Sequence, residues 1–214
     1  MKGVYKLKTF INKYLKWILL GILVFVFGLI VHELFEDKLS SFDTAVYSFI
    51  ISFKNPFLTF FFKFISYLAS PPTLIILSLV MFLAFKNKKY GLLSLISLIF
   101  ITISNQILKL VFSRERPFNL MMVEEHGYSF PSGHAMVSTA FYGVLIYLIW
   151  KTNLNIKYKK MWTIILSILI LLIGISRIYL GVHYASDIVA GFTISISYII
   201  ILVTLINYYL KSRK

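Results

Sequence analysis

The hydrophobic positions of this chain fall into long runs without charged residues, separated by short polar segments. A helix needs about 20 mostly apolar residues to cross a bilayer, and fewer where flanking lysines reach the interface. The pattern therefore predicts an all-α fold: a bundle of six transmembrane helices that forms a single domain over residues 1–214. The six runs are 17–31, 64–85, 90–108, 135–150, 161–176 and 188–210.

The segment between the first two runs predicts helical structure on the membrane surface. Residues 34–63 are rich in phenylalanine but also carry charged residues, as an interfacial helix does. Asn55 and Pro56 form a helix start, and Pro71 with Pro72 is expected to begin the second crossing. The aromatic residues serve either to anchor and pack this external segment or to wall a groove for lipid chains.

The lysine-rich start before the first apolar run raises the alternative of a signal peptide. The residues that follow the run, His32 to Phe35, contain no small-x-small cleavage pattern. We therefore expect an uncleaved first transmembrane helix.

Composition supports a membrane location, since 59% of the 214 residues are hydrophobic and only 14% are charged. Fifteen of the 22 Lys and Arg residues fall in segments 2–16, 86–89, 151–160 and 211–214, which lie on one side of the predicted membrane. All eight acidic residues and all four histidines fall on the other side. The positive-inside rule then makes both termini cytoplasmic in a multi-pass protein of the cell membrane.

Charge and cysteine usage exclude several functions. The basic residues behind the net charge of +14 are divided among four juxtamembrane segments. This distribution indicates that they set the orientation in the membrane and attract anionic lipid headgroups, and it argues against nucleic-acid binding. The absence of cysteine excludes disulfides, thiolate catalysis and metal sites with Cys ligands.

The first of three polar strings near the external face is Lys109, Arg116 and Pro117. The two cations are seven residues apart, so on a continuing helix they would share one face. Pro117 disfavours helix at Arg116 and would instead turn the guanidinium over the helix exit. Taken alone, two cations at a helix end are usually interfacial anchors.

The second string, Pro131 to His134, opens the fourth crossing. A helix start presents unpaired backbone N–H groups and positive partial charge, which suit an anion. Gly133 lets a phosphate oxygen approach the backbone, and Ser132 adds a hydroxyl donor. A simple helix cap explains the same residues.

The third string holds Ser176, Arg177, His183 and Asp187 at the junction of the last two crossings. Ionisable residues near a membrane are candidates for function. If the sixth helix begins near His183, the carboxylate four residues later can accept a hydrogen bond from one imidazole nitrogen. That contact would leave the other nitrogen free as a nucleophile.

Together these strings resemble the motifs of the type-2 phosphatidic acid phosphatase family, and every motif position matches between residues 109 and 187. The resemblance implies that His183 is a nucleophile forming a phosphohistidine, that Asp187 orients it, and that His134 is the general acid. It also implies a phosphate cradle, composed of Lys109, Arg116, Arg177, Ser132 and Gly133.

We therefore expect an integral membrane lipid phosphatase that acts at the external leaflet. No metal or other cofactor is expected, because three cations and a helix start can neutralise a transferring phosphoryl group. The expected partners are the bilayer and a lipid phosphate; the oligomeric state stays open. Relatives of this size act on undecaprenyl diphosphate, ranked first, or on phosphatidylglycerol phosphate and phosphatidic acid.

A transporter or scramblase that binds lipid phosphate without cleaving it is the alternative. The pair of His183 and Asp187 favours the enzyme, since binding alone needs no oriented nucleophile. A related vanadate-dependent haloperoxidase uses a similar site, but six crossings argue against that class. His32, His126, Glu124 and Glu125 are interpreted as interfacial or solvated loop residues.

Overall fold

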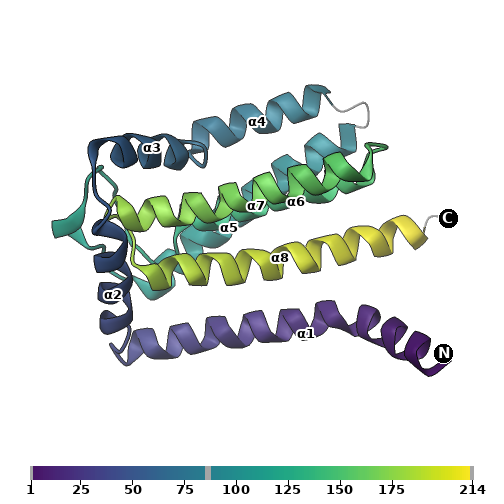
Figure 1. Ribbon diagram of the computed structural model, residues 1–214, viewed down its shortest axis with the longest axis horizontal. Coiled ribbons are helices and arrows are strands. Elements are labelled where there is room, and N and C mark those ends of the chain that lie inside the picture. Colours follow the sequence, from purple (N-terminus) through teal and green to yellow (C-terminus); the bar gives the residue numbers. More distant parts are fainter. Residues whose placement is uncertain (1, 85–87, 213–214) are drawn as a thin grey trace.

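A computed structural model describes residues 2–84 and 88–212 and shows a helical bundle (Figure 1). No strand occurs among these residues, so the all-α prediction is confirmed. The elements are α1 (Lys2–Phe35), α2 (Ser40–Ile51), α3 (Pro56–Tyr67), α4 (Pro71–Ala84), α5 (Lys88–Phe112), the 3-10 turn η1 (Phe118–Leu120), α6 (Gly133–Lys151), α7 (Ile156–Tyr179) and α8 (Ala185–Ser212).

The described residues contain five helical spans, or six if a bent pair of helices counts as one, against the six that were predicted. Within the described residues, α1, α5, α6, α7 and α8 are long and apolar enough to span a bilayer. The shorter apolar helix α4 continues from α3 along the length of the bundle (Figure 1). Helix α4 begins at Pro71, the expected start of the second crossing, but it is shorter than the other spans. Phe85, its predicted end, and parts of the clusters at 86–89 and 211–214 lie outside the described residues.

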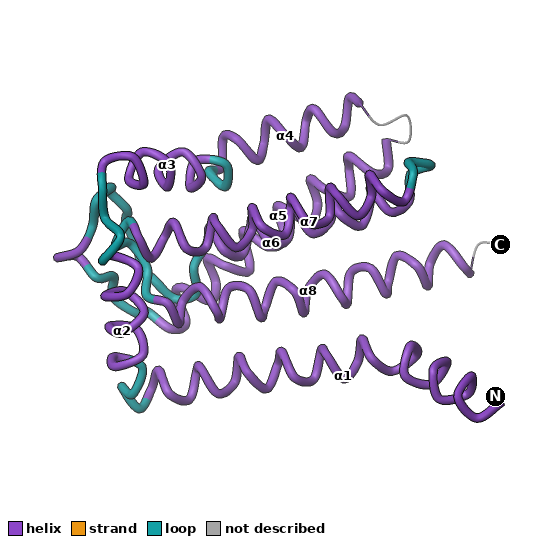
Figure 2. Tube along the Cα trace, in the orientation of Figure 1, coloured by secondary structure: helices purple, strands orange, loops and turns teal. Residues whose placement is uncertain are grey.

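The predicted surface segment consists of two helices. A bend of 119° separates α2 from α3, and α2 lies across the end of the bundle (Figure 2). Asn55 caps α3 as predicted, because its side-chain oxygen accepts the N–H of Leu58 at 2.9 Å and Pro56 holds the first helical position. Through these two helices the segment contacts α7 and α8.

Helix α6 lies at the centre of the bundle, where it packs against α5, α7 and α8. Its buried residues include Phe141, Val144 and Leu148, which join Leu166 and Ile173 of α7 in the main apolar cluster. Helix α1 packs on α8, and most of its described apolar side chains face outward. Outward apolar side chains suit a bundle whose surroundings are lipid.

The two termini lie at one end of the bundle, and α2 with the long α5–α6 connection lies at the other (Figures 1 and 2). The three polar strings all map to this second end: the C-terminal end of α5, the start of α6 and the α7–α8 junction. The topology therefore gathers residues that are up to 78 positions apart into one region.

Candidate active site

The α7–α8 junction is a tight turn that places a histidine just before α8. Gly181 adopts a φ of +68°, and a Cβ at this position would collide with the backbone carbonyl of Leu120. Only glycine fits such a turn without strain. Asp187, in the first turn of α8, accepts the backbone N–H of Tyr184 at 3.0 Å and so caps the helix that carries it.

His183 and Asp187 form a buried pair, as the four-residue spacing suggested. The Nδ1 atom of His183 lies 3.2 Å from Oδ2 of Asp187, and both residues are almost fully buried. The other ring nitrogen, Nε2, lies 3.2 Å from Nη1 of Arg116. A guanidinium only donates, so Nε2 is an acceptor and Nδ1 carries the proton given to Asp187. The lone pair of Nε2 therefore faces the cationic side of the site.

The surroundings of His183 keep its imidazole neutral. Burial, joined by the positive charges of Arg177, Arg116 and Lys109, holds the pKa of His183 well below its ordinary value of 6.5. A neutral imidazole is the nucleophilic form.

Arg116 reaches the site from a loop and not from a helix. Helix α5 ends at Phe112, so the helix of Lys109 does not continue to Arg116, which agrees with the expected effect of Pro117. Its guanidinium donates to three backbone carbonyls, those of Gly127 (2.9 Å), Val182 (2.9 Å) and His126 (3.2 Å). These bonds fix the guanidinium beside His183. Although burial lowers the pKa of Arg116, it remains a cation.

Arg177 is buried at the end of α7 with one donor left over. Its Nη1 donates to the hydroxyl of Ser66 at 2.6 Å, and its Nη2 pairs with the carboxylate of Glu125. The Nε–H group is buried and has no partner among the described residues. A buried donor without an acceptor is costly, so this group is suited to an additional anionic ligand.

The start of α6 supplies the second histidine. Ser132 caps the helix, accepting the N–H of Ala135 at 3.4 Å, while its own N–H donates to the backbone carbonyl of Asp187 at 3.1 Å. A Cβ on Gly133 would lie 2.9 Å from Oδ1 of Asn105, so a larger residue here would have to displace that amide. Asn105 in turn donates to the carbonyl of Pro131 at 3.0 Å.

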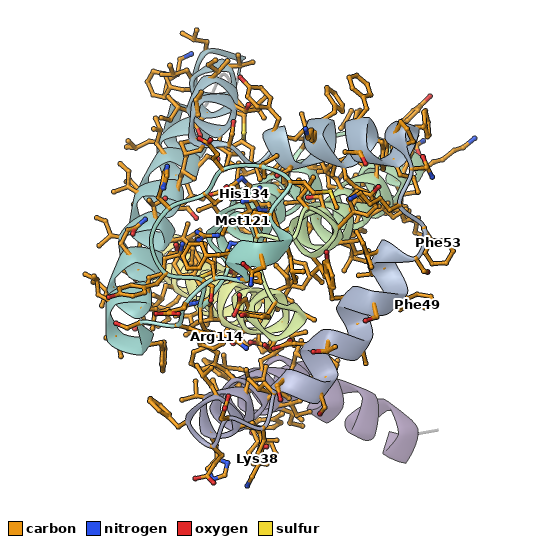
Figure 3. All side chains as sticks on the ribbon, turned by 90° about the vertical axis from the view of Figure 1, so that its left-hand side faces the viewer. Lys38, Phe49, Phe53, Arg114, Met121 and His134 are labelled. Atoms are coloured by element: carbon orange, nitrogen blue, oxygen red, sulfur yellow. The ribbon has the colours of Figure 1, made fainter. Side chains whose placement is uncertain are left out.

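His134 and Lys109 complete the cluster without direct ion pairs among the described residues. His134 is half-buried, and the charges of Arg177, Lys109 and Arg116 lie within electrostatic range of its ring. Lys109 is also half-buried. Figure 3 views this end directly: His134 and Arg114 lie near its middle among the helix ends, whereas Lys38 and Phe53 lie toward the rim.

Arg114 is a site residue that the sequence interpretation missed. It bridges two carboxylates, with Nη1 2.6 Å from Asp187 and Nη2 2.8 Å from Asp43 on α2. Burial acts to lower the pKa of Arg114, but Asp187 and Asp43 outweigh it and raise that pKa. The available signal was its position two residues before Arg116, among only seven basic residues on this side.

Glu125 is a correction to the sequence interpretation. It is not a solvated loop residue, because its carboxylate pairs with Arg177 and lies 3.7 Å from Arg116. By contrast, Glu124 and His126 have exposed side chains, and exposed His32 lies 3.4 Å from Glu33. Among the described residues no group of three or more His, Cys, Asp or Glu side chains is arranged to hold a metal ion.

These features define a multi-pass membrane protein with a cationic, histidine-containing site at one end of its bundle. The pattern of the PAP2 superfamily matches residues 90–211, more than half of the chain. The chain belongs to the PAP2 superfamily.

Two curated relatives have similar sequences. Phosphatidylglycerophosphatase B of Bacillus subtilis is 33% identical over 180 residues, which cover 81% of this chain and 88% of the relative. Undecaprenyl-diphosphatase of Sulfolobus acidocaldarius is 32% identical over 113 residues, half of each chain. With the family membership, these relatives make the chain a membrane lipid phosphatase.

Two solved structures share the fold. The transmembrane PAP2-type phosphatidylglycerolphosphate phosphatase from Bacillus subtilis has a TM-score of 0.80 and 29% identity, covering 88% of this chain and 96% of that protein. Aquifex aeolicus LpxE has a TM-score of 0.63 and 26% identity, with coverages of 75% and 94%.

Proposed function

We propose that this phosphatase cleaves lipid phosphates through a phosphohistidine formed at Nε2 of His183. The observation that carries the proposal is the orientation of this buried imidazole: Nδ1 is held by Asp187, and Nε2 faces Arg116 at 3.2 Å. A nucleophile aimed at a cluster of cations suits attack on phosphorus better than binding alone. This favours hydrolysis over the alternative of a non-hydrolytic transporter or scramblase.

The proposed cradle consists of the cations and the helix start around Nε2. Arg116, Arg177 and Lys109 neutralise the equatorial oxygens, and the unpaired Nε–H of Arg177 gains an acceptor. The start of α6, with Ser132 and Gly133, supplies further donors. Because these groups provide the positive charge that phosphoryl transfer requires, we propose that the reaction needs no metal ion.

In the first step, the lone pair of His183 Nε2 forms a bond to phosphorus while the bond from phosphorus to the leaving oxygen breaks. His134 donates a proton to that oxygen, and Asp187 stabilises the charge gained by the imidazole. The anionic phosphate offsets the cations near His134 and so favours its protonated form. In the second step, water gives a proton to His134 and attacks phosphorus, which frees His183 and inorganic phosphate.

We propose phosphatidylglycerol phosphate as the first substrate to test and undecaprenyl diphosphate as the second. The sequence alone ranked them in the opposite order. Similarity to the phosphatidylglycerophosphatase covers 81% of this chain, whereas similarity to the undecaprenyl-diphosphatase covers half of it.

The lipid chain has a candidate binding groove next to the site. A groove of about 280 Å³ runs between α5, α6 and α8. Leu108 and Met136 line it, and each is within one helical turn of a cradle residue, Lys109 or Ser132. The lining is Phe100, Ile101, Ser104, Ile107, Leu108, Met136, Ile194 and Tyr198.

We propose that the site faces the external side and that both termini are cytoplasmic. The support is the charge distribution along the sequence: 15 of the 22 basic residues belong to segments that the order of crossings predicts on the side of the termini, and all eight acidic residues belong to segments predicted on the opposite side. The site lies at the end opposite the termini (Figure 1).

The decisive experiment assays purified protein in detergent micelles for phosphate release from a panel of lipid phosphates, with His183→Ala as the blank. Acid-labile, base-stable phosphoenzyme should form in wild type and be missing from His183→Ala. Phosphate release by His183→Ala at the wild-type rate would refute the mechanism. Lipid phosphate binding with no release by wild type would favour the transporter or scramblase.

A further inference from the structure

Asp43 is a buried carboxylate that lies outside all three polar strings. It sits in the first turn of α2, the helix across the end of the bundle, and is only 3% exposed. Its Oδ1 accepts the backbone N–H of Ser186 at 2.8 Å, and its Oδ2 accepts the hydroxyl of Ser186 at 2.8 Å. A surface helix thus provides a charged partner for the start of α8.

Arg114 connects this carboxylate to the candidate nucleophile. One guanidinium nitrogen donates to Asp43 at 2.8 Å, and the other donates both to Asp187 at 2.6 Å and to the hydroxyl of Ser186 at 2.8 Å. The guanidinium also lies over the ring of Tyr184, 4.0 Å from its centre. Arg114 is therefore held on three sides.

The sharing of one guanidinium by two carboxylates affects how Asp187 can serve His183. If Arg114 paired only with Asp187, its guanidinium would compete with His183 for both oxygens of that carboxylate. Because Asp43 pairs with one nitrogen of the Arg114 guanidinium, Asp187 keeps its Oδ2 as the acceptor for Nδ1–H of His183 and for the N–H of Tyr184. The chain of contacts from Asp43 thus ends at Nδ1 of His183, whereas Nε2 is the proposed nucleophile.

We propose that Asp43 is a positioning residue for the phosphatase reaction, acting through Arg114 and Asp187 to fix the orientation of the His183 imidazole. The proposal rests on the proposed function, and it makes the surface helix α2 part of the support of the site. A purely structural role, as a cap for α8, would affect stability and leave the imidazole unchanged.

The test combines kinetics with ¹⁵N NMR of histidine-labelled protein in detergent. The signals of His183 are assigned by their loss from His183→Gln. Asp43→Asn keeps an oxygen for the Ser186 N–H but removes the charge shared with Arg114. Because small displacements of a reacting group lower rates steeply, kcat should fall by about 10- to 100-fold with KM within about twofold. The NMR signals of Nδ1 and Nε2 should shift as the Nε2–H tautomer becomes populated.

Two further variants separate positioning from capping and from charge. Arg114→Lys retains the charge and leaves Asp43 free to cap α8. Because one ammonium cannot pair with both carboxylates as the guanidinium does, this variant should cause the same shift of the His183 signals as Asp43→Asn. Asp37→Asn is the matched control: Asp37 is exposed, precedes α2, and has a φ of 53° that asparagine also adopts. It should retain wild-type kcat and wild-type signals.

Unchanged His183 signals in folded Asp43→Asn would overturn the proposal, whatever the activity. If Asp43→Asn does not fold, unchanged signals in Arg114→Lys would overturn it equally. If wild type releases no phosphate from any lipid, the proposed function fails, while a shift of the His183 signals still supports the positioning role.

Discussion

Replacing Arg177 by alanine removes the buried guanidinium whose Nε–H has no acceptor among the described residues. In the proposed cradle, a bound phosphoryl group offers an acceptor to this Nε–H and, by displacing Glu125, to Nη2. Two hydrogen bonds to a charged group contribute about 1.5–3 kcal/mol each. Displacing Glu125 offsets part of this sum of about 3–6 kcal/mol, leaving about 2–4 kcal/mol in the transition state.

Arg177→Ala should therefore lower kcat/KM by about 30- to 10³-fold. Arg177→Lys should recover only part of the loss, because an ammonium keeps the charge but lacks the planar fork. The assay is phosphate release in micelles over a range of lipid phosphate concentrations. Lys63→Ala, which removes an exposed cation from α3, serves as the control and should stay near wild type.

Folding must be checked, since Arg177 also donates to Ser66 on α3 at 2.6 Å. Thermal unfolding in detergent and elution as a single species provide that check. A folded Arg177→Ala protein with kcat/KM within threefold of wild type would show that Arg177 does not contact the transferring group.

Four further outcomes are expected. Because the pKa of His183 lies well below 6.5, its imidazole stays neutral as the solution is acidified. The acid limb of the pH profile of kcat/KM should therefore lie below pH 6.5. A flat profile from about pH 5 to 9 would contradict the two-histidine assignment. Vanadate should inhibit as an analogue of the five-coordinate transition state, and inhibition should weaken in Arg177→Ala. EDTA should leave activity unchanged; a preparation silenced by EDTA and restored by a divalent ion would contradict metal independence. Since the chain has no cysteine, a membrane-impermeant maleimide on intact cells should label His126→Cys and not Leu154→Cys, and the reverse would invert the topology.

Filling the groove tests the proposed location of the lipid chain. Ser104→Trp places a large side chain in the groove lining, away from the cradle. It should raise KM for a long-chain lipid phosphate several-fold and leave hydrolysis of para-nitrophenyl phosphate unchanged. Equal effects on both substrates would rule out a role confined to the lipid chain.

The sequence predicted those features that depend on local patterns. Apolar runs gave the crossings, Asn55 with Pro56 gave the start of α3, and the four-residue spacing gave the contact between His183 and Asp187. Each signal lies within one turn or one helix, where periodicity and capping operate.

Contacts between distant segments could not be predicted in the same way. Asp43 meets Ser186 across 143 positions, and Glu125 meets Arg177 across 52. No helical period relates such residues, because their meeting depends on how α2 and the α5–α6 loop fold over the end of the bundle. The sequence alone does not distinguish Glu125 from a solvated loop carboxylate, because its contact depends on the fold of that loop.

The backbone bond from Ser132 N–H to the carbonyl of Asp187, 3.1 Å long, joins the starts of α6 and α8. Of the two histidines of the proposed mechanism, His134 is the second residue of α6, and His183 lies two residues before the start of α8. This contact is made by main-chain atoms, so among substitutions of Ser132 only proline, which lacks the N–H, removes it. Because the bond joins the two helix starts, we expect a tilt of α6 or α8 in a bilayer of different thickness to carry the proposed acid and nucleophile together.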